Sequence, residues 1–183
     1  DYLKINNFKI TLCNDTKKIL EKFSEKKTDF KNKIKNLKAS KENLNSKKFL
    51  DFCNSINYLK RDLKDHQKKS FYHLNTAECS ANFSVPGSGK TSVVLAFYEK
   101  LKLENNIDAI FVIGPKNCYY SWNTEFNLTL NRDPKIKILD ESKIERKKIY
   151  ESYLKSELYA CHFMTVANDI KYLEKFISKK KFL

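Results

Sequence analysis

The residues of this chain best suited to phosphate chemistry form one octapeptide, Ser84-Val85-Pro86-Gly87-Ser88-Gly89-Lys90-Thr91. The chain has only three glycines and three prolines, and two of the glycines and one of the prolines fall here. Glycine lets the backbone fold tightly enough for successive N–H groups to face one anion. Lys90 can then reach the β- and γ-phosphates, and the Thr91 hydroxyl can bind Mg²⁺. The octapeptide therefore predicts a P-loop, although Ser84 stands where the strict pattern has glycine.

The flanking residues predict a strand before the loop and a helix after it. The run from Cys79 to Phe83 is extended and partly apolar, and the run from Thr91 to Tyr98 is mostly apolar. A helix that starts at the loop adds its unpaired N–H groups and the positive end of its dipole. The alternative is a surface turn that merely contains Gly-Ser-Gly-Lys. The residues expected to bind ATP here are Val85, Pro86, Gly87, Ser88, Gly89, Lys90, Thr91 and Ser92, with Lys90 and Thr91 catalytic and Thr91 on the metal.

The composition is strongly basic. The 183 residues include 36 Lys and Arg against 22 Asp and Glu, which gives a net charge of +14. Such a surplus suits a phosphate-rich partner such as nucleic acid, although a well-solvated basic surface has the same composition. A hydrophobic content of 41% is enough for one domain with an appendage. No apolar run approaches membrane-spanning length, so we expect no membrane partner.

Cysteine and histidine usage argues against a zinc site. The five cysteines lie far apart with no Cys-x-x-Cys pair, and the three histidines have no metal-ligand spacing. Scattered thiols fit a reducing compartment, so we expect an intracellular location, cytoplasmic or nuclear. The sequence opens at Asp1 with neither a methionine nor a signal peptide, which suggests a fragment or a processed product.

Residues 1–59 predict a basic, mostly helical accessory module. Alternating apolar residues over 1–13, with Asn6-Asn7 as the turn, predict a short β-hairpin. Periodic apolar residues predict a helix from Asn14 to about 37 and a second helix capped by Ser40. This module either contacts nucleic acid or a protein partner, or packs on the neighbouring domain with a solvated lysine face.

Residues 60–183 alternate between helical and extended patterns. The predicted helices are 64–74, the segment after the P-loop, 118–126, 142–154 and 167–177, and the predicted strands are 79–83, 108–113, 135–139 and 159–164, with another beginning at 182. Repeated β-α units predict an α/β fold with a parallel sheet and helices on both faces. Ligands in such folds bind at the carboxyl ends of the strands. Gly114-Pro115 lies at that end of one strand, so we take this edge as the working face.

Beyond the P-loop, three stretches over about residues 60–183 resemble helicase superfamily two, nearest to the Swi/Snf-type DNA translocases. The segment Leu63-Lys64-Asp65-His66-Gln67 is similar to the family's Leu-Arg-x-Tyr-Gln. Phe111-Val112-Ile113-Gly114-Pro115, followed by Ser121-Trp122-Asn123-Thr124-Glu125-Phe126, resembles motif Ia. Phe163-Met164-Thr165-Val166-Ala167-Asn168-Asp169-Ile170 is similar to motif Ib, with valine where tyrosine is common.

This resemblance implies the first RecA-like lobe of an ATP-dependent motor, with ATP and Mg²⁺ as cofactors and nucleic acid, most simply double-stranded DNA, as partner. Gln67 would read the adenine, since an amide can pair with N6–H and N7. Pro115, Lys116 and Thr165 would contact the nucleic-acid backbone. The simpler alternatives are a surface residue for Gln67, a solvated Lys116, and a Thr165 that only caps the next helix.

The family's acidic Asp-Glu pair and its second RecA-like lobe would follow Leu183, so we expect the present segment to bind nucleotide weakly without hydrolysing it. Two other interpretations stay open. One is a different P-loop enzyme, such as a nucleotide kinase or an AAA-type ATPase. The other is a degenerate lobe that binds nucleic acid or protein without catalysis.

Overall fold

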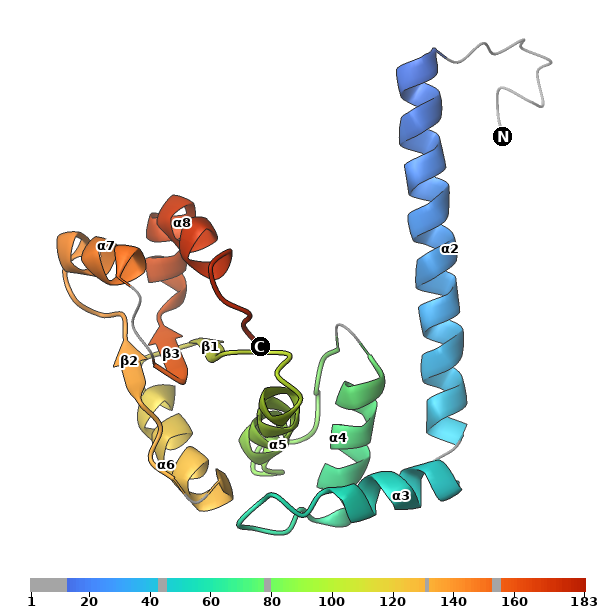
Figure 1. Ribbon diagram of the computed structural model, residues 1–183, viewed down its shortest axis with the longest axis horizontal. Coiled ribbons are helices and arrows are strands. Elements are labelled where there is room, and N and C mark those ends of the chain that lie inside the picture. The colour runs from blue at the N-terminus through green and yellow to red at the C-terminus, as the bar shows by residue number, and fades with distance from the viewer. Residues whose placement is uncertain (1–12, 43–45, 78–79, 131, 153–155) are drawn as a thin grey trace. The chain divides into compact units, whose positions relative to one another are not determined.

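A computed structural model describes residues 13–42, 46–77, 80–130, 132–152 and 156–183 (Figure 1). The predicted hairpin falls almost wholly within residues 1–12, which lie outside the described residues. The chain divides into two compact units, Asp1–Leu44 and Asn45–Leu183. Each unit is described separately below.

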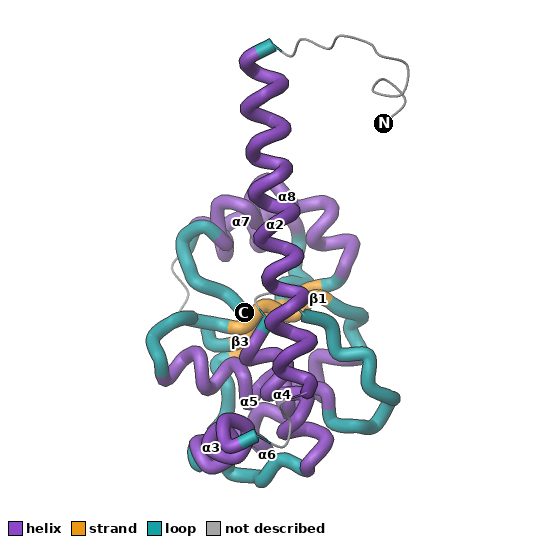
Figure 2. Tube along the Cα trace, turned by 90° about the vertical axis from the view of Figure 1, so that its right-hand side faces the viewer, coloured by secondary structure: helices purple, strands orange, loops and turns teal. Residues whose placement is uncertain are grey.

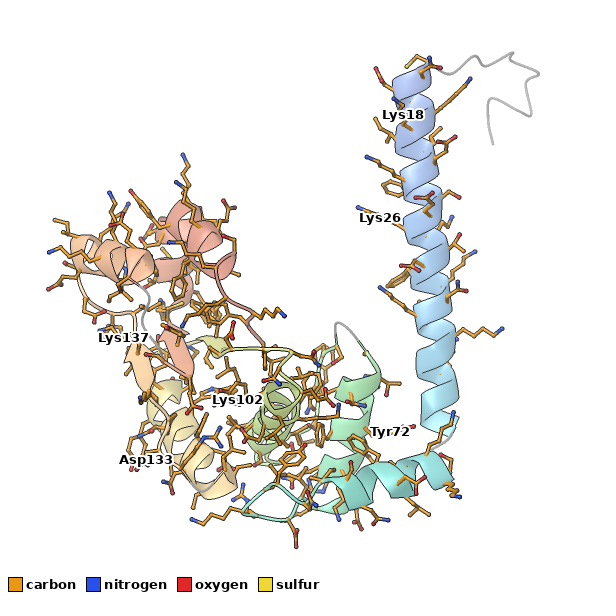
Figure 3. All side chains as sticks on the ribbon, in the orientation of Figure 1. Lys18, Lys26, Tyr72, Lys102, Asp133 and Lys137 are labelled. Carbon is orange, nitrogen blue, oxygen red and sulfur yellow. The ribbon has the colours of Figure 1, made fainter. Side chains whose placement is uncertain are left out.

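The described residues of the first unit form one long helix, α2 (Asn14–Glu42). It begins where the sequence predicts, but it continues through Ser40, so the prediction that Ser40 caps a second helix is wrong. The reason is that no glycine or proline interrupts this span, and most of its residues are good helix formers. Figure 3 shows side chains projecting from α2 along its length, among them Lys18 and Lys26.

The second unit begins with α3 (Lys47–Ser55), whose N-cap is Ser46. The Ser46 hydroxyl accepts a hydrogen bond from the N–H of Phe49 at 3.4 Å. The sequence assigned this stretch to the N-terminal module, whereas α3 packs on α4 (Asp65–Thr76). Edge-to-face ring contacts join the two helices, Phe49 to Tyr72 at 5.3 Å and Phe52 to Phe71 at 4.9 Å. Aromatic side chains that recur along α3 therefore tie it to the second unit.

At the centre of the second unit, the described residues form a parallel sheet of three strands, β1 (Ile110–Ile113), β2 (Ile136–Ile138) and β3 (Leu158–Cys161), in the order β1-β3-β2. Leu158 lies opposite Ile110 on one side and Ile136 on the other. The predicted α/β class with a parallel sheet is confirmed, with strands shorter than the sequence suggested.

The last residues of the chain lie along the free edge of β1. Phe182 forms a parallel bridge with Ala109, and the N–H of Leu183 donates to the carbonyl of Ala109 at 3.0 Å. The N–H of Phe111 in turn donates to the carbonyl of Leu183 at 3.0 Å. Phe182 thus makes a single parallel bridge to the residue before β1, at the position where the sequence predicts that another strand begins.

Helices cover both faces of this sheet. Figures 1 and 2 show α5 (Lys90–Leu103) and α6 (Cys118–Leu130) on one side of the strands, and α7 (Lys143–Glu151) and α8 (Phe163–Ile177) on the other. Side chains alternate between the two layers, as expected for strands buried on both faces. The layer on α5 and α6 takes Ile110, Val112, Leu158 and Ala160. The layer on α7 and α8 takes Ala109, Phe111, Tyr159 and Cys161.

A buried ion pair joins α7 to α8. The carboxylate of Asp169, which is 1% exposed, accepts hydrogen bonds from Arg146 Nε at 2.6 Å and from the Tyr150 hydroxyl at 3.0 Å. Burial alone would raise the pKa of Asp169, but these hydrogen bonds and the Arg146 charge outweigh it and leave the pKa lowered. The pair fixes how the two helices meet.

The prediction of a strand at 79–83, before the P-loop, is wrong for those of its residues that the structure describes. Residues 80–85 form no strand, and the side chain of Phe83 is 93% exposed. The carbonyl of the Asn82 side chain accepts the N–H of Ser84 at 3.1 Å, which makes a local turn of the kind asparagine favours. The edge of β1 that does not pair with β3 is occupied instead by Phe182 and its neighbours.

Candidate functional site

The predicted P-loop folds as a tight turn that leads into α5. Gly87 and Gly89 have φ angles of +80° and +77°, which residues with a Cβ rarely adopt. The N–H of Ser88 donates to the carbonyl of Val85 at 3.2 Å, and that of Val93 donates to Gly89 at 3.3 Å. The turn therefore needs both glycines.

Several main-chain donors of this turn are open. Within the described part of the chain, the N–H groups of Gly87, Gly89, Lys90 and Thr91 have no hydrogen-bond acceptor. The Ser88 hydroxyl is also buried there without a partner among those residues. Unpaired donors in a glycine turn at a helix N-terminus are the usual arrangement for binding an anion.

The ammonium group of Lys90 lies across the same turn. Its Nζ donates to the carbonyl of Ser84 at 2.8 Å and to the carbonyl of Val85 at 3.1 Å. These neutral acceptors hold the ammonium close to the open N–H groups without neutralising its charge. A phosphate bound at the turn would be a stronger acceptor for it.

A hollow of about 500 Å³ opens beside the turn, which is large enough for a nucleotide. Its wall includes Ser121 from the first turn of α6, which follows β1 directly. The hollow thus lies at the edge of the sheet where β1 ends. Its lining residues are Arg61, Asp62, Lys64, His66, Gln67, Gly87, Ser88, Gly89, Lys90, Thr91, Ser92, Ser121 and Glu125.

Two residues of α4 hold the phosphate turn from the side. Gln67 Nε2 donates to the carbonyl of Ser88 at 3.0 Å, and His66 Nε2 lies 3.1 Å from the same oxygen. Gln67 Oε1 accepts the N–H of Lys64 at 2.9 Å. An amide has two N–H donors and two lone pairs, so one of each is left on Gln67. The structure therefore brings Gln67 into the cavity wall with half of its hydrogen-bonding capacity in use.

Gly89 is required for this contact as well as for the turn. A Cβ added at Gly89 would lie 2.1 Å from Gln67 Nε2, whereas one at Gly87 would meet nothing within 4 Å. A side chain at position 89 would therefore displace the Gln67 amide from the carbonyl of Ser88.

A second polar cluster in the wall was not predicted from the sequence. The Nη2 atom of Arg61 donates to Ser92 Oγ at 2.8 Å and forms an ion pair with Glu125. Ser92 is fully buried, and its hydroxyl donates to Glu125 Oε1 at 2.5 Å. The stretch around Trp122 included Glu125, but spacing alone could not show that α6 turns this carboxylate toward the first turn of α5.

The predicted nucleic-acid contacts lie outside the cavity lining. Pro115 and Lys116 are exposed in the loop that follows β1. Because the N–H of Gly114 donates to the carbonyl of Cys161 at 3.0 Å, this loop starts beside the end of β3. The tips of the two strands are therefore neighbours on one edge of the sheet.

Thr165 occupies a different local setting from the one predicted. The strand ends at Cys161 and α8 starts at Phe163, with His162 as its N-cap, so Thr165 neither ends a strand nor caps the helix. His162 Nδ1 accepts the N–H of Met164 at 3.3 Å, which starts the helix earlier than the apolar pattern indicated. The N–H of Thr165 donates to the carbonyl of His162 at 2.9 Å. Only the hydroxyl of Thr165 is left for a phosphate.

One residue of the cavity wall could bind the metal of a nucleotide. It is Thr91, the second residue of α5, which lines the cavity. Among the described residues, no group of three or more His, Cys, Asp or Glu side chains could hold a metal ion by itself. Magnesium at Thr91 would take its other oxygen ligands from phosphates and water.

Compared with known protein families and with curated proteins, the sequence matches none. None of the described helices is long and apolar enough to cross a membrane.

Proposed function

We propose that this chain is the first RecA-like, ATP-binding lobe of a nucleic-acid translocase or helicase of the Swi/Snf type, with double-stranded DNA as its expected track. One observation carries the proposal. The open N–H groups of Gly87, Gly89, Lys90 and Thr91 and the Lys90 ammonium lie together in the wall of a cavity of nucleotide size. The parallel sheet with helices on both faces supports the RecA-like part of the proposal.

In this proposal each group of the turn has a defined partner. The open N–H groups donate to phosphate oxygens, and Lys90 exchanges the carbonyls of Ser84 and Val85 for the β- and γ-phosphates. The Thr91 hydroxyl provides one ligand to Mg²⁺, which neutralises phosphate charge when it is bound. Gln67 reads the adenine with its remaining donor and acceptor while it keeps its bond to Ser88.

The nucleic-acid part of the proposal is supported by the adjacent strand tips. Lys116 follows β1 and Thr165 follows β3, and these strands pair directly. Two groups on neighbouring tips can contact successive phosphates of one strand. Such contacts are independent of base sequence and weaken with salt.

Phosphoryl transfer requires more than the phosphate turn itself offers. It needs a carboxylate that holds the metal, a positioned water molecule, and a cation that neutralises the developing charge. We propose that the acidic pair and a second lobe supply these groups, so that the 183 residues bind nucleotide but do not turn it over.

Calorimetric titration of the 183-residue chain with ATP and Mg²⁺ tests the binding step. We expect Lys90→Ala to weaken binding roughly ten- to a hundredfold, as removal of a charged hydrogen-bond donor does. Lys69→Ala is the matched control, because Lys69 is exposed on α4 and does not line the cavity. Equal affinities of wild type and Lys90→Ala would refute the proposed site. Lys90-dependent ATP hydrolysis by this chain alone would refute the assignment of turnover to other groups.

A further inference from the structure

We propose that Arg61 is a further ligand of the nucleotide phosphates, and that Ser92 and Glu125 hold it in position for this role. The inference rests on the proposed ATP site and extends it by a cation that neither the P-loop pattern nor the family resemblance includes. Arg61 lies just before α4 and lines the same cavity as Lys90.

The guanidinium group of Arg61 has donors to spare. A guanidinium carries five N–H donors, and both described contacts of Arg61 use Nη2 alone. Among the described residues, neither Nε nor Nη1 has a partner. The side chain is 46% exposed and Arg61 lines the cavity, so a ligand bound there can reach it.

The position of the guanidinium is fixed from two elements. Ser92 belongs to the first turn of α5, next to the predicted metal ligand Thr91, and Glu125 belongs to α6. Because Ser92 also donates to Glu125 at 2.5 Å, the three polar groups form a closed triangle. A planar group that is already held loses little freedom when it binds, and its remaining donors suit the paired oxygens of a phosphate.

The ion pair with Glu125 is compatible with a role in phosphate binding. In protein kinases a carboxylate from a neighbouring helix holds the lysine that contacts the ATP phosphates, and both partners are needed. Here Glu125 would do the same for Arg61. Glu125 is thus a positioning residue, and only Arg61 touches the ligand.

Titration with two ligands separates this role from a structural one. ATP and inorganic tripolyphosphate share the phosphate chain, so Arg61→Ala should weaken both by a similar factor of about ten or more. Arg61→Lys should recover part of the loss, and Glu125→Gln should weaken both ligands less than Arg61→Ala does. Lys60→Ala is the control, because Lys60 is the exposed neighbour of Arg61 and does not line the cavity. Thermal melting of each variant identifies any that fail to fold. If Arg61→Ala fails to fold, Arg61→Lys still tests the role of Arg61.

Three outcomes would overturn the inference. Unchanged ATP affinity in Arg61→Ala, alongside a loss in Lys90→Ala, would refute the role of Arg61 and leave the ATP site intact. A loss for ATP with no loss for tripolyphosphate would mean that Arg61 contacts the nucleoside instead. Wild-type protein that binds neither ligand would refute the ATP site and this inference together.

Discussion

The side-chain amide of Gln67 donates a hydrogen bond to the main-chain carbonyl of Ser88 at 3.0 Å, which joins α4 to the phosphate turn. His66 approaches the same oxygen at 3.1 Å. The turn is therefore positioned by its own glycines and also by a neighbouring helix. A substitution in either α4 or the phosphate turn should therefore affect the position of the other.

The two glycines of the turn offer a matched pair of substitutions. Gly87→Ala and Gly89→Ala both place a side chain at positive φ, which costs roughly 1–2 kcal/mol of stability. Only Gly89→Ala also displaces the Gln67 amide from Ser88, so we expect it to lose about 1 kcal/mol more. Urea denaturation measures the difference, and ATP titration should show the larger loss for Gly89→Ala.

The same prediction can be checked by a double-mutant cycle. In a Gln67→Ala background the amide is already gone, so the extra effect of Gly89→Ala over Gly87→Ala should disappear. If the extra effect persists in that background, the crowding at Gly89 does not act through Gln67.

The buried pair of Asp169 and Arg146 predicts a dependence of stability on acid pH. The pKa of Asp169 is lowered in the folded protein, so its contribution is present above the pKa of the unfolded chain and is lost as pH falls through the folded value. Asp169→Asn leaves the Arg146 charge without its counter-ion and should cost about 3–5 kcal/mol at neutral pH. Urea denaturation between pH 7 and pH 3 should show a shallower loss of stability in this variant than in wild type.

Glu174→Gln is the control for that experiment, because Glu174 is exposed on the same helix. It should leave both the stability at neutral pH and the acid slope close to wild type. An unchanged acid slope in Asp169→Asn would show that other carboxylates dominate acid unfolding.

The strand tips predict a specific pattern of DNA affinity. Lys116→Ala should weaken double-stranded DNA binding at every sequence tested and reduce the salt slope by about one, because one phosphate contact is removed. Lys135→Ala should have little effect, since Lys135 precedes β2 and lies at the opposite edge of the sheet. Fluorescence anisotropy at several salt concentrations distinguishes the two. Equal slopes for both variants would argue against the proposed track.

Thiol reactivity provides a test of the packing. The hydrogen bond with the Thr16 hydroxyl, at 3.0 Å, lowers the pKa of exposed Cys13, whereas burial raises the pKa of Cys161 to about 11. The thiolate is the reactive form, so iodoacetamide should modify Cys13 well before Cys161 in the folded protein. Peptide mass spectrometry resolves the two sites. The difference should vanish in urea, and early modification of Cys161 without urea would contradict the buried α7–α8 layer.

Much of the second unit could be predicted from local patterns. The apolar run after Lys90 predicts α5, and short apolar runs around Val112 and Ala160 predict parallel strands. The predictions failed where a polar side chain redirects the backbone. Asn82 forms a local turn where a strand was expected, and His162 caps α8 earlier than expected. Each effect depends on a single hydrogen bond, which the apolar periodicity of the sequence does not predict.

Part of the candidate site could likewise be predicted from local sequence, and part could not. The P-loop pattern located the glycines, Lys90 and Thr91 because their chemistry is set by neighbours in sequence. Arg61 and Glu125 are separated by 64 positions. They meet because the segment before α4 lies against α6, where the N–H of Lys60 donates to the carbonyl of Thr129 at 2.9 Å. Spacing along the chain contains no information about that contact.

Because side chains along β1 and β3 alternate between the two faces, the sheet separates two apolar clusters. The apolar cluster on α5 and α6 and the cluster on α7 and α8 have no member in common. Substitutions that preserve volume within one layer therefore leave the other layer's packing unchanged. The apolar core of the α7–α8 half can therefore be redesigned while the core that borders the nucleotide cavity stays constant.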